Sequence, residues 1–295
     1  MSTKSSCPLT IIITTYNRPQ LLPRAVRSAL SQTVEDIEVL VVDDGSTKPV
    51  DLPTHPKLTV LRLPVNRGLA AARNAGAAGA RGRWITHLDD DDELLPCFAE
   101  VSIDALLRTR EPRPVAVISG LEEVNQHGDV IETHFPPTLS RGSFFGFADI
   151  EPRLSFFSKQ TLVVERELLR QVGGFDESLA ALPYTELFLR LNQVCTILGL
   201  PVVTYRQLVH AGARLSRDRS RRRSDYDRLV TRHRNLLDAH PKLFAAVALR
   251  QARALYAFGD VRGALVGLAQ AVRCEPRHAL RRITPLVLRA ALGRR

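Results

Sequence analysis

Residues 84–96 read WITHLDDDDELLP, an apolar run that ends in four consecutive aspartates, Asp89 to Asp92. An earlier stretch has the same form, because residues 37–46 read IEVLVVDDGS and end in the pair Asp43 and Asp44. Each apolar run predicts a strand, and the continuous run LTIIITT at residues 9–15 is typical of a strand buried on both faces. Ligands of open parallel sheets gather beyond the carboxyl ends of the strands. The acidic run alone could be a solvated turn capping a helix from Glu93, but two acidic strand ends favour a ligand site.

The surrounding sequence predicts an α/β fold with a mostly parallel central sheet and flanking helices. Further strands are predicted at 9–15 (LTIIITT) and 58–63, and each is followed by a helical pattern. The region 115–133 contains a polar turn and indicates antiparallel or mixed pairing, and residues 161–164 form another strand.

The chain divides by composition into an α/β domain over residues 1–215 and a basic helical extension over residues 216–295. Residues 243–276 are typical of a helical hairpin. They also resemble a single tetratricopeptide unit, but such repeats need several copies to share a core.

The charge follows the same division. The 295 residues carry a net charge of +10, yet residues 1–205 have 20 basic and 25 acidic side chains and residues 206–295 have 21 basic and 6 acidic side chains.

The four cysteines form no CxxC pair, which argues against a disulfide framework or a cysteine-rich zinc site. No apolar window is long enough to span a bilayer. We therefore expect a cytoplasmic protein, with any membrane contact peripheral.

The aspartates indicate a divalent cation. Mg²⁺ and Mn²⁺ prefer oxygen ligands, commonly one or two carboxylates completed by water and phosphate. Arg67 and Arg73 offer guanidinium groups suited to phosphate or base oxygens, and Tyr16 offers an aromatic face. A nucleoside diphosphate is the ligand that uses all of these groups.

Four ordered segments resemble the inverting family 2 glycosyltransferases, which have the nucleotide-diphospho-sugar transferase fold called GT-A. They are TIIITTYNRPQLLPRAVRSALSQT, IEVLVVDDGST, NRGLAAARNAGAAGARGRWITHLDDDDELLP and VGGFDESL, and they span residues 10–179. The resemblance implies a UDP-, GDP- or dTDP-sugar donor, Mn²⁺ or Mg²⁺, and transfer of the sugar to an acceptor hydroxyl with inversion. The acceptor would be a growing surface polysaccharide or a lipid-linked glycan.

The resemblance also implies roles for individual residues. Base and ribose contacts fall to four positions: Thr15, Tyr16 by stacking, Asp44 at the base ring nitrogen, and Arg67. The Asp-x-Asp pair is Asp89 and Asp91, with Asp91 the metal ligand and Asp90 beside ribose or phosphate. His210 matches a late family position that contacts metal or diphosphate, although an ordinary surface histidine is an equal alternative. Arg73 is equally a site residue or a structural partner.

The general base is where the sequence departs from the family. Pro183 and Tyr184 stand where the family has Glu-Asp, and an unperturbed tyrosine titrates near pH 10, too high for a base at neutral pH. We predict Glu186 as the base, with Asp176 a weaker candidate that more simply braces a turn. The competing interpretation is a catalytically silent protein that binds nucleotide-sugars.

Two other classes of function are disfavoured. A nucleotidyltransferase would need a glycine-rich phosphate loop with a lysine, which the sequence lacks. Nucleic-acid binding is disfavoured because the basic extension has few aromatic residues and no known nucleic-acid motif.

Residues 277–295 mix Arg with Leu, Ile and Val at near-helical spacing, which predicts peripheral contact with the cytoplasmic face of a membrane. A solvated basic face is the alternative.

Overall fold

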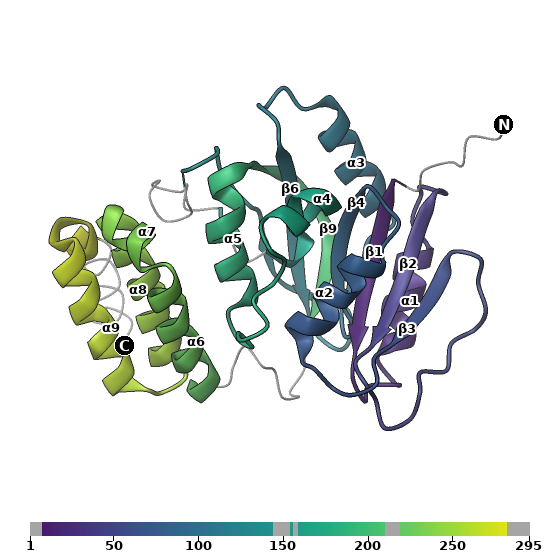
Figure 1. Cartoon of the computed structure of the whole chain (residues 1–295), viewed down its shortest axis with the longest axis horizontal. Helices are drawn as coiled ribbons and strands as arrows, with labels where there is room; N and C mark the ends of the chain where they lie inside the picture. The colour runs from purple at the N-terminus through teal and green to yellow at the C-terminus, as the bar shows by residue number, and fades with distance from the viewer. Residues whose placement is uncertain (1–7, 144–153, 156–158, 210–218, 282–295) are drawn as a thin grey trace. The chain divides into compact units, whose positions relative to one another are not determined.

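The computed structural model describes residues 8–143, 154–155, 159–209 and 219–281. They form two compact units, an α/β unit that ends at residue 209 and a helical unit that begins at residue 219 (Figure 1). The domain boundary predicted at residue 215 lies outside the described residues, as does His210.

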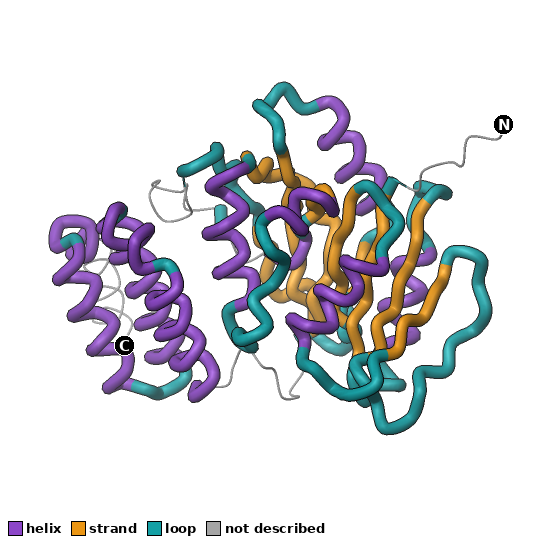
Figure 2. The backbone as a smooth tube through the Cα atoms, viewed as in Figure 1, coloured by secondary structure: helices purple, strands orange, loops and turns teal. Residues whose placement is uncertain are grey.

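The α/β unit is built on one mixed sheet (Figure 2). Its strands lie in the order β3-β2-β1-β4-β8-β6-β9-β5, and β7 pairs with β6 at the side. The strands are β1 (Leu9–Thr15), β2 (Ile37–Asp43), β3 (Leu58–Arg62), β4 (Trp84–Asp89), β5 (Glu93–Leu94), β6 (Val115–Val124), β7 (Val130–His134), β8 (Val163–Glu165) and β9 (Thr196–Leu208).

The first four strands run parallel, as the sequence predicts. β1 lies between β2 and β4, with Thr15 opposite Asp43 and Thr14 opposite Asp89. The carboxyl ends of these three strands therefore meet at one edge of the sheet. The later part is mixed: β8 is antiparallel to β4 and β6, and β6 and β7 form the antiparallel hairpin expected there.

Helices cover both faces of the sheet. They are α1 (Leu22–Leu30), α2 (Leu69–Gly79), α3 (Phe98–Arg108), the short helix η1 (Lys159–Thr161), α4 (Arg166–Gln171) and α5 (Pro183–Val194). Leu9, Ile11 and Ile13 share a buried cluster with residues of α1 and α3. Ile12 points to the opposite face because side chains alternate along a strand. There a Cβ on Gly76 of α2 would lie 2.4 Å from the Ile12 Cγ2 atom, so only glycine allows this close approach.

Two elements differ from the sequence predictions. The helix expected from Glu93 is absent, because β5 pairs with β9 there and α3 begins at Phe98. β9 was not predicted, although it pairs in parallel with β6 over most of its length. Gly199 and Pro201 interrupt its apolar pattern, and both residue types are typical of turns.

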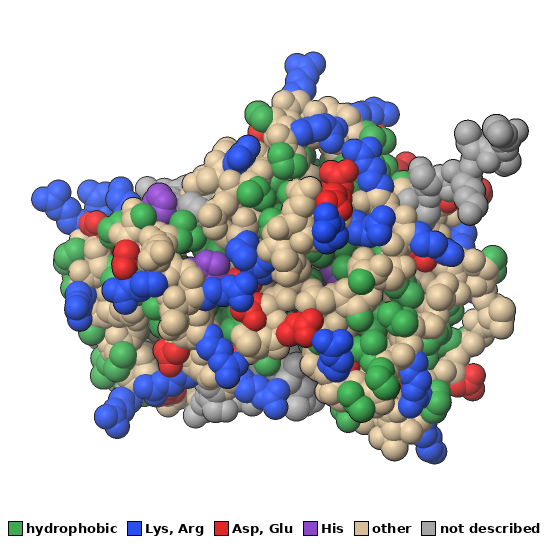
Figure 3. Space-filling model, in the orientation of Figure 1, with side chains coloured by type: hydrophobic (Ala, Val, Ile, Leu, Met, Phe, Trp, Pro, Cys, Tyr) green, Lys and Arg blue, Asp and Glu red, His purple; other side chains and the backbone are tan. Residues whose placement is uncertain are grey.

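The helical unit contains α6 (Arg219–Arg232), α7 (Arg234–Ala239), α8 (Pro241–Ala257) and α9 (Val261–Cys274). α8 and α9 pack against each other as the predicted helical hairpin. Asp260 caps α9 by accepting a hydrogen bond from the backbone N–H of Gly263 at 2.8 Å. Figure 3 shows Lys and Arg side chains spread over the surface of this unit.

Candidate functional site

Hydrogen bonds join the polar residues at the ends of β1 and β4. Thr15 Oγ1 donates a hydrogen bond to Asp90 Oδ2 at 2.7 Å. Arg18, in the loop after β1, donates from Nη1 to Asp90 Oδ1 at 3.0 Å and to Asp91 Oδ2 at 3.2 Å. The parallel register thus gathers the side chains that the strand ends predict. Arg18 was not singled out from the sequence, where it is one arginine among many.

Asp44 organises the loop that enters α2. Its two carboxylate oxygens accept hydrogen bonds from the backbone N–H groups of Arg67 and Gly68 at 2.8 and 2.9 Å. A carboxylate has about four lone-pair sites, so two acceptor positions of Asp44 remain for the base of a nucleotide. Tyr16 follows Thr15, whose carbonyl accepts a hydrogen bond from the Asp44 backbone N–H at 2.9 Å, and Tyr16 is 45% exposed. The base-binding roles of Asp44 and Tyr16 stay predictions.

Gly45 makes the turn after Asp44 possible. Its φ is +71°, a left-handed conformation, and an added Cβ would lie 2.4 Å from the carbonyl carbon of Val65. Both the backbone angle and the space therefore require glycine.

We expect Gly45→Ala to lower the free energy of unfolding by about 3 kcal/mol, through left-handed strain and a clash with rigid backbone. Urea unfolding measures this change. Gly128→Ala is the matched control, because Gly128 also has a positive φ of +88° but nothing within 4 Å of its Cβ position. We expect the control to cost only about 1 kcal/mol. Equal losses in the two variants would contradict the clash.

The four consecutive aspartates have different surroundings. Asp92 is buried, and it accepts hydrogen bonds from the Tyr205 hydroxyl at 2.8 Å and the Leu208 backbone N–H at 3.0 Å. Burial, with the charges of Asp89 and Asp91, raises the pKa of Asp92 well above its usual value. Burial also raises the pKa of Asp90 to about 6, against the opposing hydrogen bond from Thr15. Asp92 is therefore tied to β9, while the other three line the strand end.

The aspartate donor set fits a hard divalent cation. One carboxylate oxygen from each of Asp89, Asp91 and Asp92 lies within 4.8 Å of the others. Oxygen-only donors at this spacing are what Mg²⁺ and Mn²⁺ prefer. A cation there would also offset the repulsion that raises the Asp92 pKa.

Arg73 is buried next to this cluster. Its side chain is 2% exposed, and Nη2 donates to Asp89 Oδ1 at 2.6 Å. The guanidinium carbon lies 4.7 Å from the centre of the Tyr184 ring and 5.3 Å from that of Phe175. Within the described ranges, Nε and Nη1 of Arg73 have no hydrogen-bond partner. Arg73 thus orients a site aspartate from inside the packed interior, and its contact with phosphate or base oxygens stays a prediction.

Tyr184 stands where the sequence resemblance implies the general base. Burial raises the pKa of Tyr184 to about 12, although Arg73 acts in the opposite direction. The hydroxyl therefore stays protonated at neutral pH to an even greater degree than that of a free tyrosine, so it is poorly suited to accept a proton.

Glu186, the predicted base, lies two residues further along α5 in a different environment. Its side chain is fully buried, and both carboxylate oxygens accept hydrogen bonds from Arg190. Arg190 also donates to the carbonyls of Val172 and Gly174, in the turn that precedes Phe175. This placement favours a structural brace over a base that reaches an acceptor.

The GGFDESL segment is anchored to α2. Asn74 accepts a hydrogen bond from the Phe175 N–H at 2.8 Å and donates to its carbonyl at 2.9 Å. Arg67 pairs with Glu177 at 3.0 Å, and both side chains are about half exposed. Asp176 accepts from the Ser178 N–H and hydroxyl, as expected for a turn brace. Arg67 is thus half exposed and paired with Glu177, and its predicted contact with base or ribose stays a prediction.

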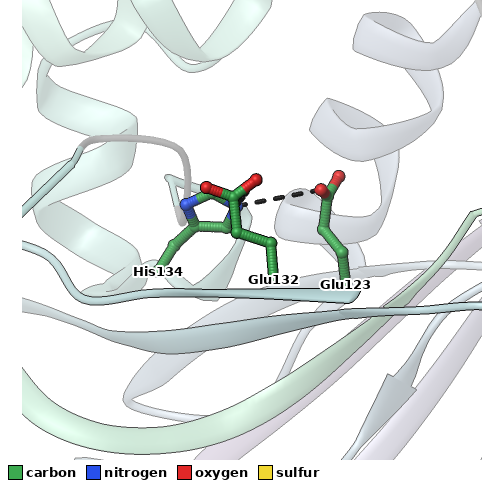
Figure 4. Close-up of side chains that lie close together, drawn as sticks. All are labelled: Glu123, Glu132 and His134. Atoms are coloured by element: carbon green, nitrogen blue, oxygen red, sulfur yellow. Dashed lines mark ion pairs between the residues drawn. The ribbon is translucent and has the colours of Figure 1, made fainter. Parts of the chain in front are cut away.

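A second cluster of possible metal ligands lies on the β6–β7 hairpin (Figure 4). Glu123 and Glu132 are directly opposite each other in the strand register. Nε2 of His134 lies 3.8 Å from a carboxylate oxygen of each. Like charges facing each other across strands repel, and the imidazole of His134 is a neighbour of both carboxylates. The cluster therefore links the two strands of the hairpin.

Comparison with known proteins decides the family. The sequence profile described as glycosyl transferase family 2 matches residues 10–171, more than half of the chain. The chain belongs to glycosyl transferase family 2. The match contains Thr15, Asp44, Arg67 and the aspartate run, so the strand-end cluster lies within the family's shared region.

Curated relatives of this family 2 chain are glycosyltransferases and polysaccharide enzymes. An uncharacterized glycosyltransferase of Haemophilus influenzae is 27% identical over 63% of this chain and 62% of its own length. The succinoglycan biosynthesis protein ExoO of Rhizobium meliloti is 41% identical over 30% of this chain and 26% of its own. Chondroitin synthase of Pasteurella multocida is 28% identical over 68% of this chain and 20% of its own. The chain thus spans less than two thirds of each of these relatives.

Solved structures confirm the fold of this family 2 member. The crystal structure of S. aureus TarS in complex with UDP-GlcNAc matches with a TM-score of 0.55 and 14% identity, over 90% of this chain and 91% of that one. The predicted GT-A fold, with C-terminal helices added to it, is therefore confirmed.

Proposed function

We propose that this chain moves a sugar from a nucleoside-diphosphate donor to an acceptor hydroxyl with inversion. The observation that carries the proposal is the set of carboxylates and guanidinium groups at the ends of β1, β2 and β4, in a chain of glycosyl transferase family 2. The UDP-GlcNAc complex of TarS, which shares the fold, supports a nucleotide-sugar donor. The sequence resemblance leaves the donor as a UDP-, GDP- or dTDP-sugar.

In this proposal different residues of the site bind different parts of the donor. Tyr16 stacks on the base, Asp44 accepts from the base ring nitrogen, and Thr15 and Arg67 contact base or ribose. Asp90, held by Thr15 and Arg18, faces the ribose or a phosphate.

Asp91 is the residue that would hold Mn²⁺ or Mg²⁺, with Asp89 beside it and His210 as a further predicted ligand. When bound, the cation would supply positive charge that stabilises the diphosphate leaving group. Arg73 holds Asp89 in position from the interior, through the 2.6 Å hydrogen bond. Asp92 ties the aspartate run to β9 through Tyr205 and Leu208.

Sugar transfer forms a bond from the acceptor oxygen to the anomeric carbon and breaks the bond from that carbon to the diphosphate. The nucleoside diphosphate leaves with the bonding electrons, and the acceptor's proton passes to a base. Glu186 is the base predicted from the sequence, and that role stays a prediction. Its pairing with Arg190 inside α5 weighs toward the structural role.

A protein that binds nucleotide-sugars without transferring them is the second candidate. The specific observation in its favour is Tyr184 at the family's base position, buried against Arg73. Both candidates bind donor, and only the first releases nucleoside diphosphate when an acceptor is present.

The relatives support a proposed biological setting. Succinoglycan biosynthesis and chondroitin synthesis both build polysaccharides, so a cell-surface polysaccharide or lipid-linked glycan is the proposed acceptor. In the described parts of the chain, no helix has the length and apolar character needed to cross a membrane. We place the activity in the cytoplasm, at the cytoplasmic face of the membrane.

Thermal unfolding with UDP-, GDP- and dTDP-sugars, each with and without Mn²⁺, tests the donor site. A ligand present at about 100 times its Kd stabilises the native state by about 2.7 kcal/mol. We expect one nucleotide class to raise the Tm, and Mn²⁺ to enlarge that rise. An unchanged Tm with every donor and Mn²⁺ would contradict the proposal.

A further inference from the structure

Helix α9 has an unusual distribution of side chains. The residues that it buries are small: Gly263, Ala264, Gly267 and Ala271. Its larger apolar residues lie outside, with Val261 54% exposed, Leu265 60% and Val266 57%. A helix that only covers a core places its large apolar residues inward. The outward face of α9 therefore has more apolar surface than its packing requires.

Close packing against α8 accounts for the small residues. A Cβ on Gly267 would lie 3.0 Å from the Ala252 Cβ and 3.2 Å from the Ala248 carbonyl oxygen. This side of α9 thus has no room for larger residues. The outward apolar side chains are each more than half exposed, so packing against α8 does not explain their size.

The charged side chains within α8 and α9 are all of one sign, and the nearest acidic residue after α9 is its C-cap residue Glu275. α8 and α9 contain no aspartate or glutamate, whereas Arg262 and Arg273 are exposed on α9. At 100° per residue, both arginines lie on the same side of α9 as Leu265 and Val266. The acidic residue nearest to the start of α9, Asp260, is used as its cap. This outer face of α9, formed by Val261, Arg262, Leu265, Val266 and Arg273, is thus both apolar and cationic.

We propose that the outer face of α9 binds the surface of an anionic lipid bilayer. Leu and Val side chains would enter the boundary between headgroups and acyl chains, while the arginines would reach lipid phosphates. Basic residues gain attraction from an anionic leaflet. This site goes beyond the transfer reaction, and it is separate from the segment 277–295 that the sequence predicts to contact membranes.

The charge pattern distinguishes this occupant from others. Two copies of the outer face of α9 would bring arginines together with no carboxylate to pair with them, which is repulsive. A nucleic acid would match the arginines, but the face offers aliphatic rather than aromatic side chains for stacking on bases. A lipid surface is the partner that matches both the apolar and the cationic side chains.

Co-sedimentation of the full chain with vesicles tests this proposal, using phosphatidylcholine alone or mixed with phosphatidylglycerol. We expect binding to the anionic vesicles and much weaker binding to the neutral ones. The double variant Leu265→Ser/Val266→Ser should bind the anionic vesicles about tenfold more weakly, because two apolar side chains no longer enter the lipid. Arg262→Gln/Arg273→Gln should bind more weakly and lose part of its salt dependence.

Val130→Ser/Ile131→Ser is the matched control, since it removes two adjacent apolar residues that are 50% and 57% exposed on β7. We expect the control to bind like the unaltered chain. Equal binding by the α9 variants, binding to neither vesicle, or a change in molar mass by light scattering on Leu265→Ser/Val266→Ser would overturn the proposal. The assay contains no nucleotide, so it succeeds or fails independently of the donor site.

Discussion

Asp91→Asn is expected to reduce sugar transfer by on the order of 10²- to 10³-fold while the protein remains folded. The substitution removes a negative charge from the donor set of Asp89, Asp91 and Asp92, whose oxygens lie within 4.8 Å of one another. An amide holds a hard cation more weakly than a carboxylate, so the diphosphate loses stabilisation as it departs. The measurement is the initial rate of nucleoside-diphosphate release at increasing Mn²⁺ concentrations, with donor and acceptor saturating.

Asp104→Asn is the control for this experiment, because Asp104 is a half-exposed carboxylate on α3 that pairs with Arg108. It should leave the rate unchanged. Asp91→Asn should also raise the Mn²⁺ concentration needed for half-maximal rate, which distinguishes a ligand from a residue that only shapes the loop. Unchanged turnover and unchanged Mn²⁺ dependence in Asp91→Asn would remove Asp91 from the metal site.

The strand ends could be predicted because their signal is local. An apolar run followed by aspartates indicates both a buried strand and its polar end, and parallel order then brings Thr15, Asp43 and Asp89 to one edge. β9 could not be predicted, because the information that defines it is not local in the sequence. Gly199 and Pro201 interrupt its pattern, and its pairing with β6 is a long-range contact that residue types alone do not encode.

Contacts between distant segments account for most of what the sequence could not predict at the site. Asp92 was grouped with its three neighbours, yet a hydroxyl 113 residues away binds it to β9. Arg18 reaches Asp90 across 72 residues. Tyr184 was recognised as a departure from the family, but its contact with the buried Arg73 depends on how α5 and α2 pack.

Glu186→Gln and Arg190→Gln are both expected to lower the free energy of unfolding by about 3 to 5 kcal/mol, because each leaves a buried charge without its partner. Glu186 is fully buried, and Arg190 is 14% exposed. The loss at Arg190 should be at least as large, since Arg190 also binds the carbonyls of Val172 and Gly174. Urea unfolding of each single variant and of the double variant gives the coupling between the two residues.

Turnover per folded molecule then separates the two roles of Glu186. A brace acts through the turn that Arg190 holds, so Glu186→Gln and Arg190→Gln should lose activity to a similar degree, and the double variant should lose little more. A base acts directly on the acceptor, so Glu186→Gln should then be far less active than Arg190→Gln at equal folded fraction. The bidentate contact with Arg190 leads us to expect the first result. Transfer would in that case depend on a base other than Glu186. Absence of turnover in the unaltered chain, with donor binding retained, would instead favour the second proposed function.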